Sequence, residues 1–223
     1  MTSVMKCGLR KLINLINKLL FMKYITPWIA AICIIVFILQ SLFPLITDIF
    51  VLVSSDVLAR PWIIFTSMFL HGSITHLIYN MFALVLFGLI LERILGTKRF
   101  TMLYFVSGLV AGIGATIFYN AALGASGAIY GILGCLAVLR PGMRVYVGYI
   151  PMPMAIAAVL WVLGDLVGMF APSGVANAAH LFGIFFGIAA GFYYRKDFGE
   201  KIIKRKIIPI PESEMRRWED KWM

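Results

Sequence analysis

Long apolar runs, separated by short polar or charged breaks, fill most of this sequence. A helix needs about 20 predominantly apolar residues to cross the roughly 30 Å hydrocarbon core of a bilayer. Six runs meet or approach that length, and we expect each to form a membrane-spanning helix. The predicted spans are Trp28–Leu45, Leu77–Leu95, Phe100–Tyr119, Ser126–Leu139, Val145–Phe170 and Ala178–Tyr194. The pattern therefore predicts an all-α integral membrane protein built as one six-helix bundle.

The two ends of the sequence differ from this apolar centre. Residues 1–25 intersperse Lys and Arg with Leu and Ile, which is typical of an amphipathic helix lying on a membrane surface. Residues 26–194 form the predicted membrane domain, and residues 195–223 form a basic tail. No small-residue cleavage site follows an early apolar core, so we expect no cleavable signal peptide.

Positive charge is distributed unevenly between the two sides of the predicted bundle. Of the 20 Lys and Arg residues, all but Arg60 precede the first span, follow the sixth, or lie in the second–third and fourth–fifth connections. Loops rich in Lys and Arg stay in the cytoplasm. The distribution thus predicts a multi-pass protein with both termini cytoplasmic. We see no organelle-type targeting segment, and together with the compact six-span core this fits a prokaryotic cell membrane.

Composition agrees with a membrane protein. The sequence is 61% hydrophobic and 13% charged, whereas soluble domains average about 45–50% and about 25%. The net charge of +10 follows the predicted topology, so we expect the lipid bilayer as a partner and no nucleic acid. Cys7, Cys33 and Cys135 form no close pair and no metal-type spacing, so we expect no disulfide, no metal site and no cofactor.

Polar side chains with catalytic potential gather at one side of the predicted bundle. With the N-terminus inside, every even-numbered span begins at the outer face. Ser126 begins the fourth span and His180 lies near the start of the sixth. His71, His76 and Asn80 lie around the start of the second. All three histidines of the sequence are therefore predicted to lie in one outer layer with the serine.

Glycines repeat every three or four residues along the fourth and sixth predicted helices. The repeats are Gly124, Gly127, Gly131 and Gly134, and then Gly183, Gly187 and Gly191 after His180. Small residues at this spacing let membrane helices approach closely. Each repeat alone is also consistent with a simple packing seam. If the two glycine faces meet, however, Ser126 and His180 come together at one depth.

The fourth predicted helix is too short to cross the hydrocarbon core. Residues Ser126–Leu139 span roughly 20 Å at about 1.5 Å per residue. The helix should therefore begin below the outer surface, after an irregular connector at Asn120–Ala125. Irregular backbone at that depth is tolerated only where it is buried in protein or lines a water-filled cavity. We therefore expect Ser126 to open into a hydrated pocket.

Three motifs at these span starts resemble those of the rhomboid intramembrane serine proteases, of the prokaryotic six-span type. They are Thr66–His71 with His76–Met81, Gly124–Gly127 with Tyr130, and Ala179–Gly183 with Gly187. Glu92 and Gly96 also resemble the Glu-x-x-x-Gly of that family. The resemblance covers most of Arg60–Tyr194 and implies a rhomboid-like bundle with a short central fourth helix.

The resemblance also implies roles for individual residues. Ser126 would be the nucleophile and His180 its general base, in a dyad with no acidic third member. Tyr130 resembles the family tyrosine whose ring packs on the catalytic imidazole. Asp165, the only carboxylate in the last two predicted spans, is expected to be structural.

His76 and Asn80 resemble the side chains that stabilise the oxyanion in this family, together with the backbone N–H of Ser126. Four residues apart, they project from one helical face. Interhelical hydrogen bonding that only holds the bundle together is the alternative. His71 matches a histidine that orders the region, and we do not include it in the catalytic set.

The implied function is that of an intramembrane serine endopeptidase that cleaves other membrane proteins in or next to their transmembrane segments. A non-catalytic rhomboid-like protein that binds membrane clients is the main alternative, but such relatives usually lack the serine or the histidine. A transporter or channel is disfavoured because the polar residues gather at one depth. A metal site is disfavoured because His71 and His76 are five residues apart, and no Glu or Cys joins them.

Overall fold

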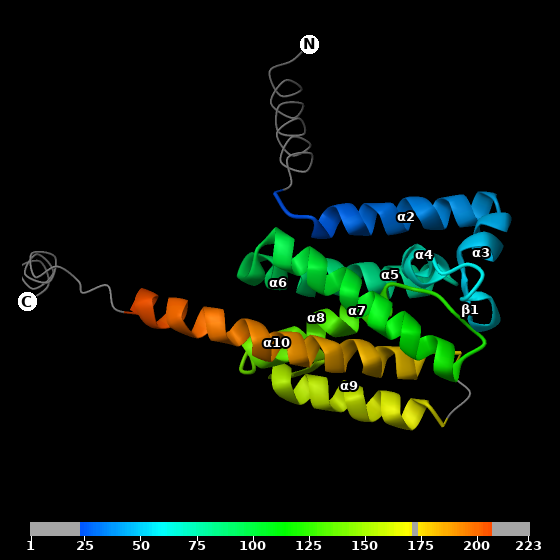
Figure 1. Ribbon diagram of the computed structural model, residues 1–223. Coiled ribbons are helices and arrows are strands. Elements are labelled where there is room, and N and C mark those ends of the chain that lie inside the picture. Colours follow the sequence, from blue (N-terminus) through cyan, green and yellow to red (C-terminus); the bar gives the residue numbers. More distant parts are fainter. Residues whose placement is uncertain (1–22, 171–173, 207–223) are drawn as a thin grey trace, which may run out of the picture.

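The computed structural model describes residues 23–170 and 174–206 (Figure 1). Most of the predicted amphipathic segment, and the tail beyond Lys206, fall outside these residues. The fold is mostly helical. The helices are α2 (Thr26–Leu42), α3 (Leu45–Phe50), α4 (Ile63–Thr66), α5 (Ile74–Ala83), α6 (Leu89–Leu95), α7 (Thr97–Phe118), α8 (Ser126–Leu139), α9 (Met154–Gly168) and α10 (Asn177–Lys206).

Helices α5 and α6 form one continuous rod, joined by a π-helical turn at Leu84–Gly88. The rod, Ile74–Leu95, and helix α7 are each 22 residues long and apolar enough to cross a membrane by length and composition. Helices α2, α8 and α9 are apolar but shorter. Gly96 ends the rod with a φ of 79°, a left-handed conformation that glycine adopts without strain.

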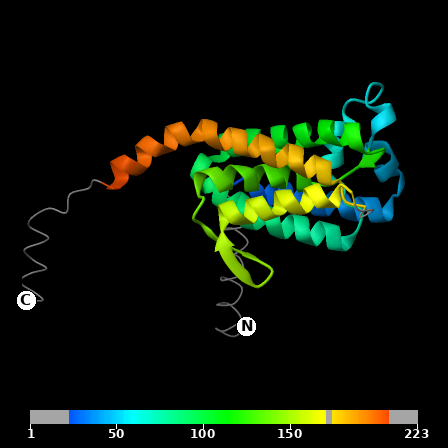
Figure 2. The ribbon, with the colours of Figure 1, turned by 90° about the horizontal axis from the view of Figure 1, so that it is seen from below.

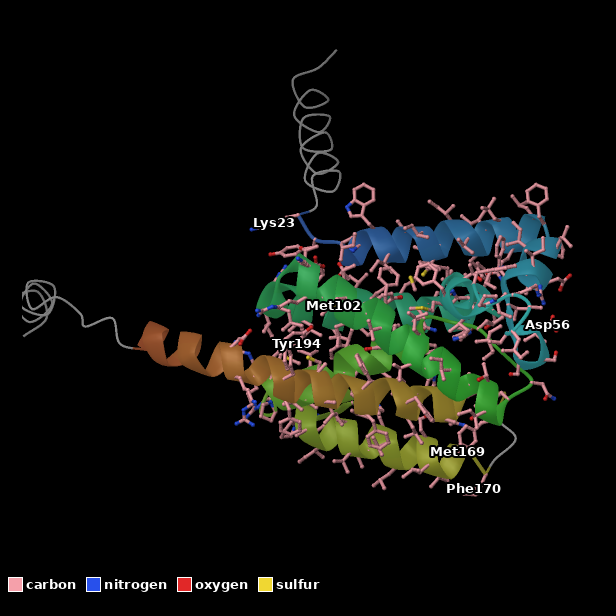
Figure 3. All side chains as sticks on the ribbon, in the orientation of Figure 1. Lys23, Asp56, Met102, Met169, Phe170 and Tyr194 are labelled. Atoms are coloured by element: carbon pink, nitrogen blue, oxygen red, sulfur yellow. The ribbon has the colours of Figure 1, made fainter. Side chains whose placement is uncertain are left out.

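The connections between helices gather at two opposite ends of the bundle. Figure 3 places Lys23 at one end, and Asp56, Met169 and Phe170 at the other. Helices α8 and α10 both begin at the Asp56 end, as the sequence predicts for even-numbered spans (Figure 1). There Arg60 forms an ion pair with Asp56, and the hydrogen bond from its guanidinium lowers the pKa of that carboxyl.

Helix α8 is the most buried helix, and it packs against α7, α9 and α10. Its contact with α10 is made by backbone atoms of the two helices, which approach closely at their glycines. A Cβ added at Gly183 would overlap the carbonyl oxygen of Gly127, and one added at Gly187 would overlap that of Gly131. The two predicted glycine faces therefore meet, and no other residue type fits this separation. The contact brings the starts of α8 and α10 side by side.

Glu92 of α6 anchors the start of α2 at the Lys23 end of the bundle, opposite the Asp56 end. Its fully buried carboxylate accepts hydrogen bonds from the N–H of Ile25 (2.7 Å), the N–H of Thr26 (3.0 Å) and the Thr26 hydroxyl (2.7 Å). These donors belong to the first turn of α2, which has no helical acceptor for them. The carboxylate thus caps a helix 66 residues away in sequence.

We expect Glu92→Ala to lower the free energy of unfolding by about 2 kcal/mol, because hydrogen bonds to charged groups contribute about 1.5–3 kcal/mol and buried donors are left unpaired. Equilibrium unfolding in mixed detergent micelles measures this change. Asp197→Ala is the control, because it removes an exposed carboxylate that pairs only at the surface with Arg99 (2.8 Å). An equal loss in both variants would contradict the capping role.

The structure corrects the prediction for the fifth span. Residues Arg144–Val147 (β3) and Ile150–Pro153 (β4) form an antiparallel hairpin, and the helix begins only at Met154. Figure 2 shows this hairpin extending from the side of the bundle. Gly148 turns the chain with a φ of 63°. The prolines at 151 and 153 lack the N–H that a helix interior needs, so an apolar stretch here cannot continue as a helix.

Two further predictions are corrected. The fold is not purely α-helical, because β3–β4 is accompanied by a second antiparallel pair, β1 (Leu52–Val53) with β2 (Ala121–Ala122). The sixth helix does not stop at Tyr194: α10 continues to Lys206, so the charged tail begins as helix. Charged residues do not by themselves end a helix, and this segment contains no proline before Pro209.

Candidate active site

A cavity of about 1590 Å³ opens where α8 and α10 begin, and all five site residues predicted from the sequence line it: His76, Asn80, Ser126, Tyr130 and His180. These residues come from three helices, α5, α8 and α10. The cavity thus joins side chains that are up to 104 positions apart in the sequence.

A constrained turn presents Ser126 at the first position of α8. Gly124 has a φ of 124°, which an L side chain rarely adopts, and its N–H donates to the carbonyl of Ser67 (2.9 Å). A Cβ at this position would also lie 2.8 Å from Cε1 of His76. The N-cap residue is Ala125, whose side chain accepts no hydrogen bond. The first N–H groups of α8 therefore have no capping side chain.

His180 lies in the first turns of α10. Its Nε2 is 2.8 Å from Oγ of Ser126. The ring of Tyr130 stacks on the imidazole with centroids 4.2 Å apart and planes 11° apart. The N–H of Ala178 donates to the hydroxyl of Tyr119 (2.9 Å), which holds the start of α10 against the end of α7. The hydrogen bond to Ser126 therefore holds the imidazole in the plane of its ring, and Tyr130 holds it by stacking on the ring face.

Asp165, which the sequence predicts to be structural, lies beside the histidine. Asp165 of α9 lies with Oδ1 3.0 Å from Nδ1 of His180, and the carboxylate is buried, with 5% of the residue exposed. Helix α9 ends and α10 begins at the same end of the bundle (Figure 1). An acid near the end of α9 and a histidine near the start of α10 therefore meet.

His76 and Asn80 lie at the cavity wall but make no hydrogen bond to Ser126 in this structure. The N–H of His76 donates to the hydroxyl of Ser73, the N-cap of α5 (3.1 Å). The side-chain amide of Asn80 donates to the carbonyl of His76 (2.9 Å). An amide group has two N–H bonds, so this contact uses only one of them.

His71 lies behind His76, away from the cavity. It is 2% exposed, and its ring meets that of His76 edge to face with centroids 5.2 Å apart. The side chain of Gln40 holds its backbone, accepting from the N–H of His71 (3.0 Å) and donating to its carbonyl (3.4 Å). Sequence reasoning missed Gln40, because a lone amide in an apolar run gives no sign of its partner.

Within residues 23–170 and 174–206, no three His, Cys, Asp or Glu side chains are grouped so that they could hold a metal ion. The cluster around Ser126 instead joins a hydroxyl, an imidazole and a carboxylate by two hydrogen bonds. Such a constellation suits acyl transfer, in which a base activates a nucleophile.

Comparison with protein families agrees with this geometry. Residues 58–197 match the Rhomboid domain, which is more than half of the chain. The chain belongs to the rhomboid family. As a rhomboid protein with two helices able to cross a bilayer, it is a membrane protein. The matched region contains the serine, both cavity histidines and Asp165.

Curated relatives include rhomboid proteins from plants and bacteria. RHOMBOID-like protein 6, mitochondrial, of Arabidopsis thaliana is 32% identical over 134 residues, 59% of this chain and 43% of the relative. The putative rhomboid protease YdcA of Bacillus subtilis is 31% identical over 134 residues, 59% of this chain and 66% of the relative. The rhomboid protease GlpG of Pectobacterium atrosepticum is 31% identical over 138 residues, 59% of this chain and 48% of the relative.

The alignments with these rhomboid relatives span between 43% and 66% of their lengths. The similarity therefore concerns the rhomboid domain rather than whole proteins. Relatives named as proteases support intramembrane proteolysis as the activity of the family.

Proposed function

We propose that this rhomboid protein is an intramembrane serine endopeptidase. It hydrolyses peptide bonds in or next to the transmembrane segments of other membrane proteins. The observation that carries the proposal is the 2.8 Å contact between Oγ of Ser126 and Nε2 of His180, inside a cavity within the bundle. A serine needs such a base, because its hydroxyl is a weak nucleophile at neutral pH.

The two residues perform two proton transfers. Nε2 of His180 takes the proton of Ser126 as Oγ attacks the scissile carbonyl, and a tetrahedral intermediate forms. The imidazolium then gives this proton to the leaving amine, and an acyl-enzyme remains on Oγ. Water repeats the sequence and releases the acid. The cavity, which opens at an end of the bundle, supplies that water.

Negative charge develops on the carbonyl oxygen during the attack. The backbone N–H of Ser126, at a helix start without a capping side chain, is one donor for it. The side chains of His76 and Asn80 are the other proposed donors, because both line the same cavity. Glycine at position 124 keeps this turn free of a Cβ, which would lie 2.8 Å from Cε1 of His76.

We expect His76→Ala and Asn80→Ala each to lower kcat by about 10²–10³-fold, the usual effect of losing one oxyanion donor, with little change in KM. Steady-state cleavage of a fluorogenic single-span substrate measures both constants. Ile78→Ala is the matched control, because this side chain lies on α5, is 58% exposed and does not line the cavity. If kcat is unchanged in the two cavity variants, these side chains have no oxyanion role.

The cavity continues from the catalytic cluster as a groove between α5 and α9. Phe82 of α5 and Leu86 of the π-helical turn line one wall, and Trp161 of α9 and Met169, which follows α9, line the other. Apolar walls suit a transmembrane segment that enters from the lipid. A helix must unwind to expose its carbonyl to Ser126, so we propose that segments with Gly or Pro near the site are preferred.

The proposed topology has six spans: α2, the α5–α6 rod, α7, the short α8, α9 and α10. Both termini are cytoplasmic, in a multi-pass cell-membrane domain of residues 26–194 with a basic segment on either side. Basic residues of the described connections support this orientation, because Lys23, Arg93, Lys98 and Arg140 lie at the end opposite Arg60. The active site then lies near the outer face.

Reconstitution tests the proposal. Purified protein in liposomes is incubated with a labelled single-span substrate, and the fragments are sized by mass spectrometry. We expect one cut in or next to the span, and inhibition by a fluorophosphonate that reacts with activated serines. Binding of the substrate without any cleavage, together with no reaction with the fluorophosphonate, would instead indicate a client-binding protein.

A further inference from the structure

We propose that Asp165 is a positioning residue, which orients the proposed general base His180 through Nδ1 of its ring. The inference rests on the proposed function of Ser126 and His180. It concerns the other nitrogen of the imidazole, Nδ1, which the proposed chemistry at Ser126 does not use. The carboxylate comes from a third helix, α9, which also forms one wall of the substrate groove.

The three side chains form a continuous hydrogen-bonded line. Oδ1 of Asp165 is 3.0 Å from Nδ1 of His180, and Nε2 is 2.8 Å from Oγ of Ser126. Asp165 and His180 are 5% and 8% exposed, so water does not compete effectively for this contact. Burying a carboxylate is costly unless it is paired. The imidazole pairs with Oδ1 of Asp165, whereas the buried Oδ2 has no hydrogen-bond partner among the described residues.

The hydrogen-bond pattern determines the tautomer of His180. An ionised carboxylate can only accept hydrogen bonds, so Nδ1 carries the hydrogen and donates it to Asp165. Nε2 then has a free lone pair directed at Oγ of Ser126, which is the form required of a general base. With the other tautomer, Nε2–H would face the hydroxyl and could not accept its proton.

Packing around the pair keeps α9 at the required distance from α10. Gly168 follows Asp165 by one turn, and a Cβ there would lie 2.8 Å from the side-chain nitrogen of Asn177, one turn before His180. Tyr130 covers the face of the imidazole at 4.2 Å. The ring therefore cannot turn without losing both of its hydrogen bonds and its stacking contact.

The carboxylate also acts during the reaction without exchanging atoms. As the proton moves from Oγ of Ser126 to Nε2, the imidazole becomes positive, and the adjacent negative charge stabilises it. The same proton later goes to the leaving amine. Asp165 stays ionised throughout, holds the ring and forms no bond with the substrate. A purely structural carboxylate would tie α9 to α10 but would not affect this charge.

A comparison of the kinetics of Asp165→Asn with those of the wild type distinguishes the positioning role from a purely structural role. A hydrogen bond to a charged group corresponds to about 10- to 100-fold in rate, so we expect kcat and the rate of fluorophosphonate labelling to fall by this factor, with KM unchanged. KM separates the two roles, because loss of a purely structural tie would let α9, a wall of the substrate groove, shift and would raise KM as well. Asp48→Asn, which changes an exposed carboxylate on α3, should leave every value unaltered.

Equal kcat and labelling rate in wild type and Asp165→Asn would overturn the positioning role. A fall in kcat accompanied by a comparable rise in KM would also overturn it, because this is the behaviour of a structural tie. Failure of the proposed function is distinct: the wild type itself would then neither cleave nor take up the fluorophosphonate.

A measurement on the unmodified protein covers the case in which Asp165→Asn does not fold. Histidine labelled with ¹⁵N reports which ring nitrogen carries the hydrogen, and the signal of His180 is identified by its loss in His180→Ala. We expect the Nδ1–H tautomer at neutral pH. The Nε2–H tautomer would contradict the inference.

Discussion

Ser126→Ala is expected to lower peptide-bond cleavage by at least about 10⁴-fold and to abolish labelling by a fluorophosphonate. Oγ of Ser126 is the nucleophile of the proposed mechanism, and His180 acts on the proton of that same oxygen atom, so removal of Oγ removes the covalent route altogether. The remaining donors around the cavity cannot substitute for Oγ, because none of the proposed ones is an activated nucleophile. His180→Ala should match this loss, since Oγ then loses the base to which it is hydrogen-bonded.

The matched control for this prediction is Ser107→Ala. Ser107 is also a fully buried helix serine, but it lies on α7 and outside the cavity. Its loss should leave both cleavage and labelling close to those of the wild type. If Ser126→Ala still forms the fragment, or if both serine variants lose activity equally, Ser126 is not the nucleophile. Gel filtration and thermal unfolding in detergent establish that both variants are folded.

Helix positions could be predicted from the sequence where apolar length and polar breaks agree. Helix α8 occupies the range Ser126–Leu139 that the sequence indicates, because glycine-rich and basic residues interrupt the apolar run at both ends. The fifth helix is different. Its first residues are apolar, yet Pro151 and Pro153 direct them into a hairpin. Apolar length alone does not distinguish a helix from a short two-stranded ribbon.

The proximity of Ser126 and His180 within the site could also be predicted from the sequence. Topology places Ser126 and His180 at one end, and the glycine faces imply that their helices touch. The hydrogen-bond partner of Nδ1 could not be predicted in this way. Asp165 is fifteen positions from His180, and the sequence does not give the distance between the two side chains. A signal was nonetheless present: a carboxylate inside an apolar span is costly unless it has a partner. The same reasoning marks Gln40 as a polar side chain in need of a partner, but it does not identify His71 as that partner.

The catalytic arrangement depends on helix packing far from the reacting atoms. Ser126 and His180 stand on separate helices, and no loop holds both. Their distance is determined by backbone contacts that continue down the α8–α10 seam, from Gly127 and Gly183 to Gly134 and Ile184. A change in this seam should therefore affect stability and activity together, although it touches no catalytic group.

Gly187→Ala tests this dependence directly. The added Cβ would overlap the carbonyl oxygen of Gly131, which belongs to the backbone of α8 and cannot rotate away. The two helices must separate, so we expect the free energy of unfolding to fall by about 3 kcal/mol, the upper range for overpacking. A larger gap at the seam also lengthens the contact between Ser126 and His180. Reaction geometry tolerates little displacement, and we expect kcat to fall by about 10²-fold.

Gly164→Ala is the matched control, because the same methyl group is added to a helix glycine on α9 where nothing lies within 4 Å of it. There the substitution should leave stability unchanged or raise it by about 0.5–1 kcal/mol, since alanine favours helix more than glycine does. Equal behaviour of the two variants in detergent unfolding would mean that the α8–α10 seam is not close-packed. A stable but inactive Gly187→Ala would show instead that α8 and α10 shift while the bundle remains folded. Either measurement reports on the separation of Ser126 and His180, which the glycines set without taking part in the chemistry.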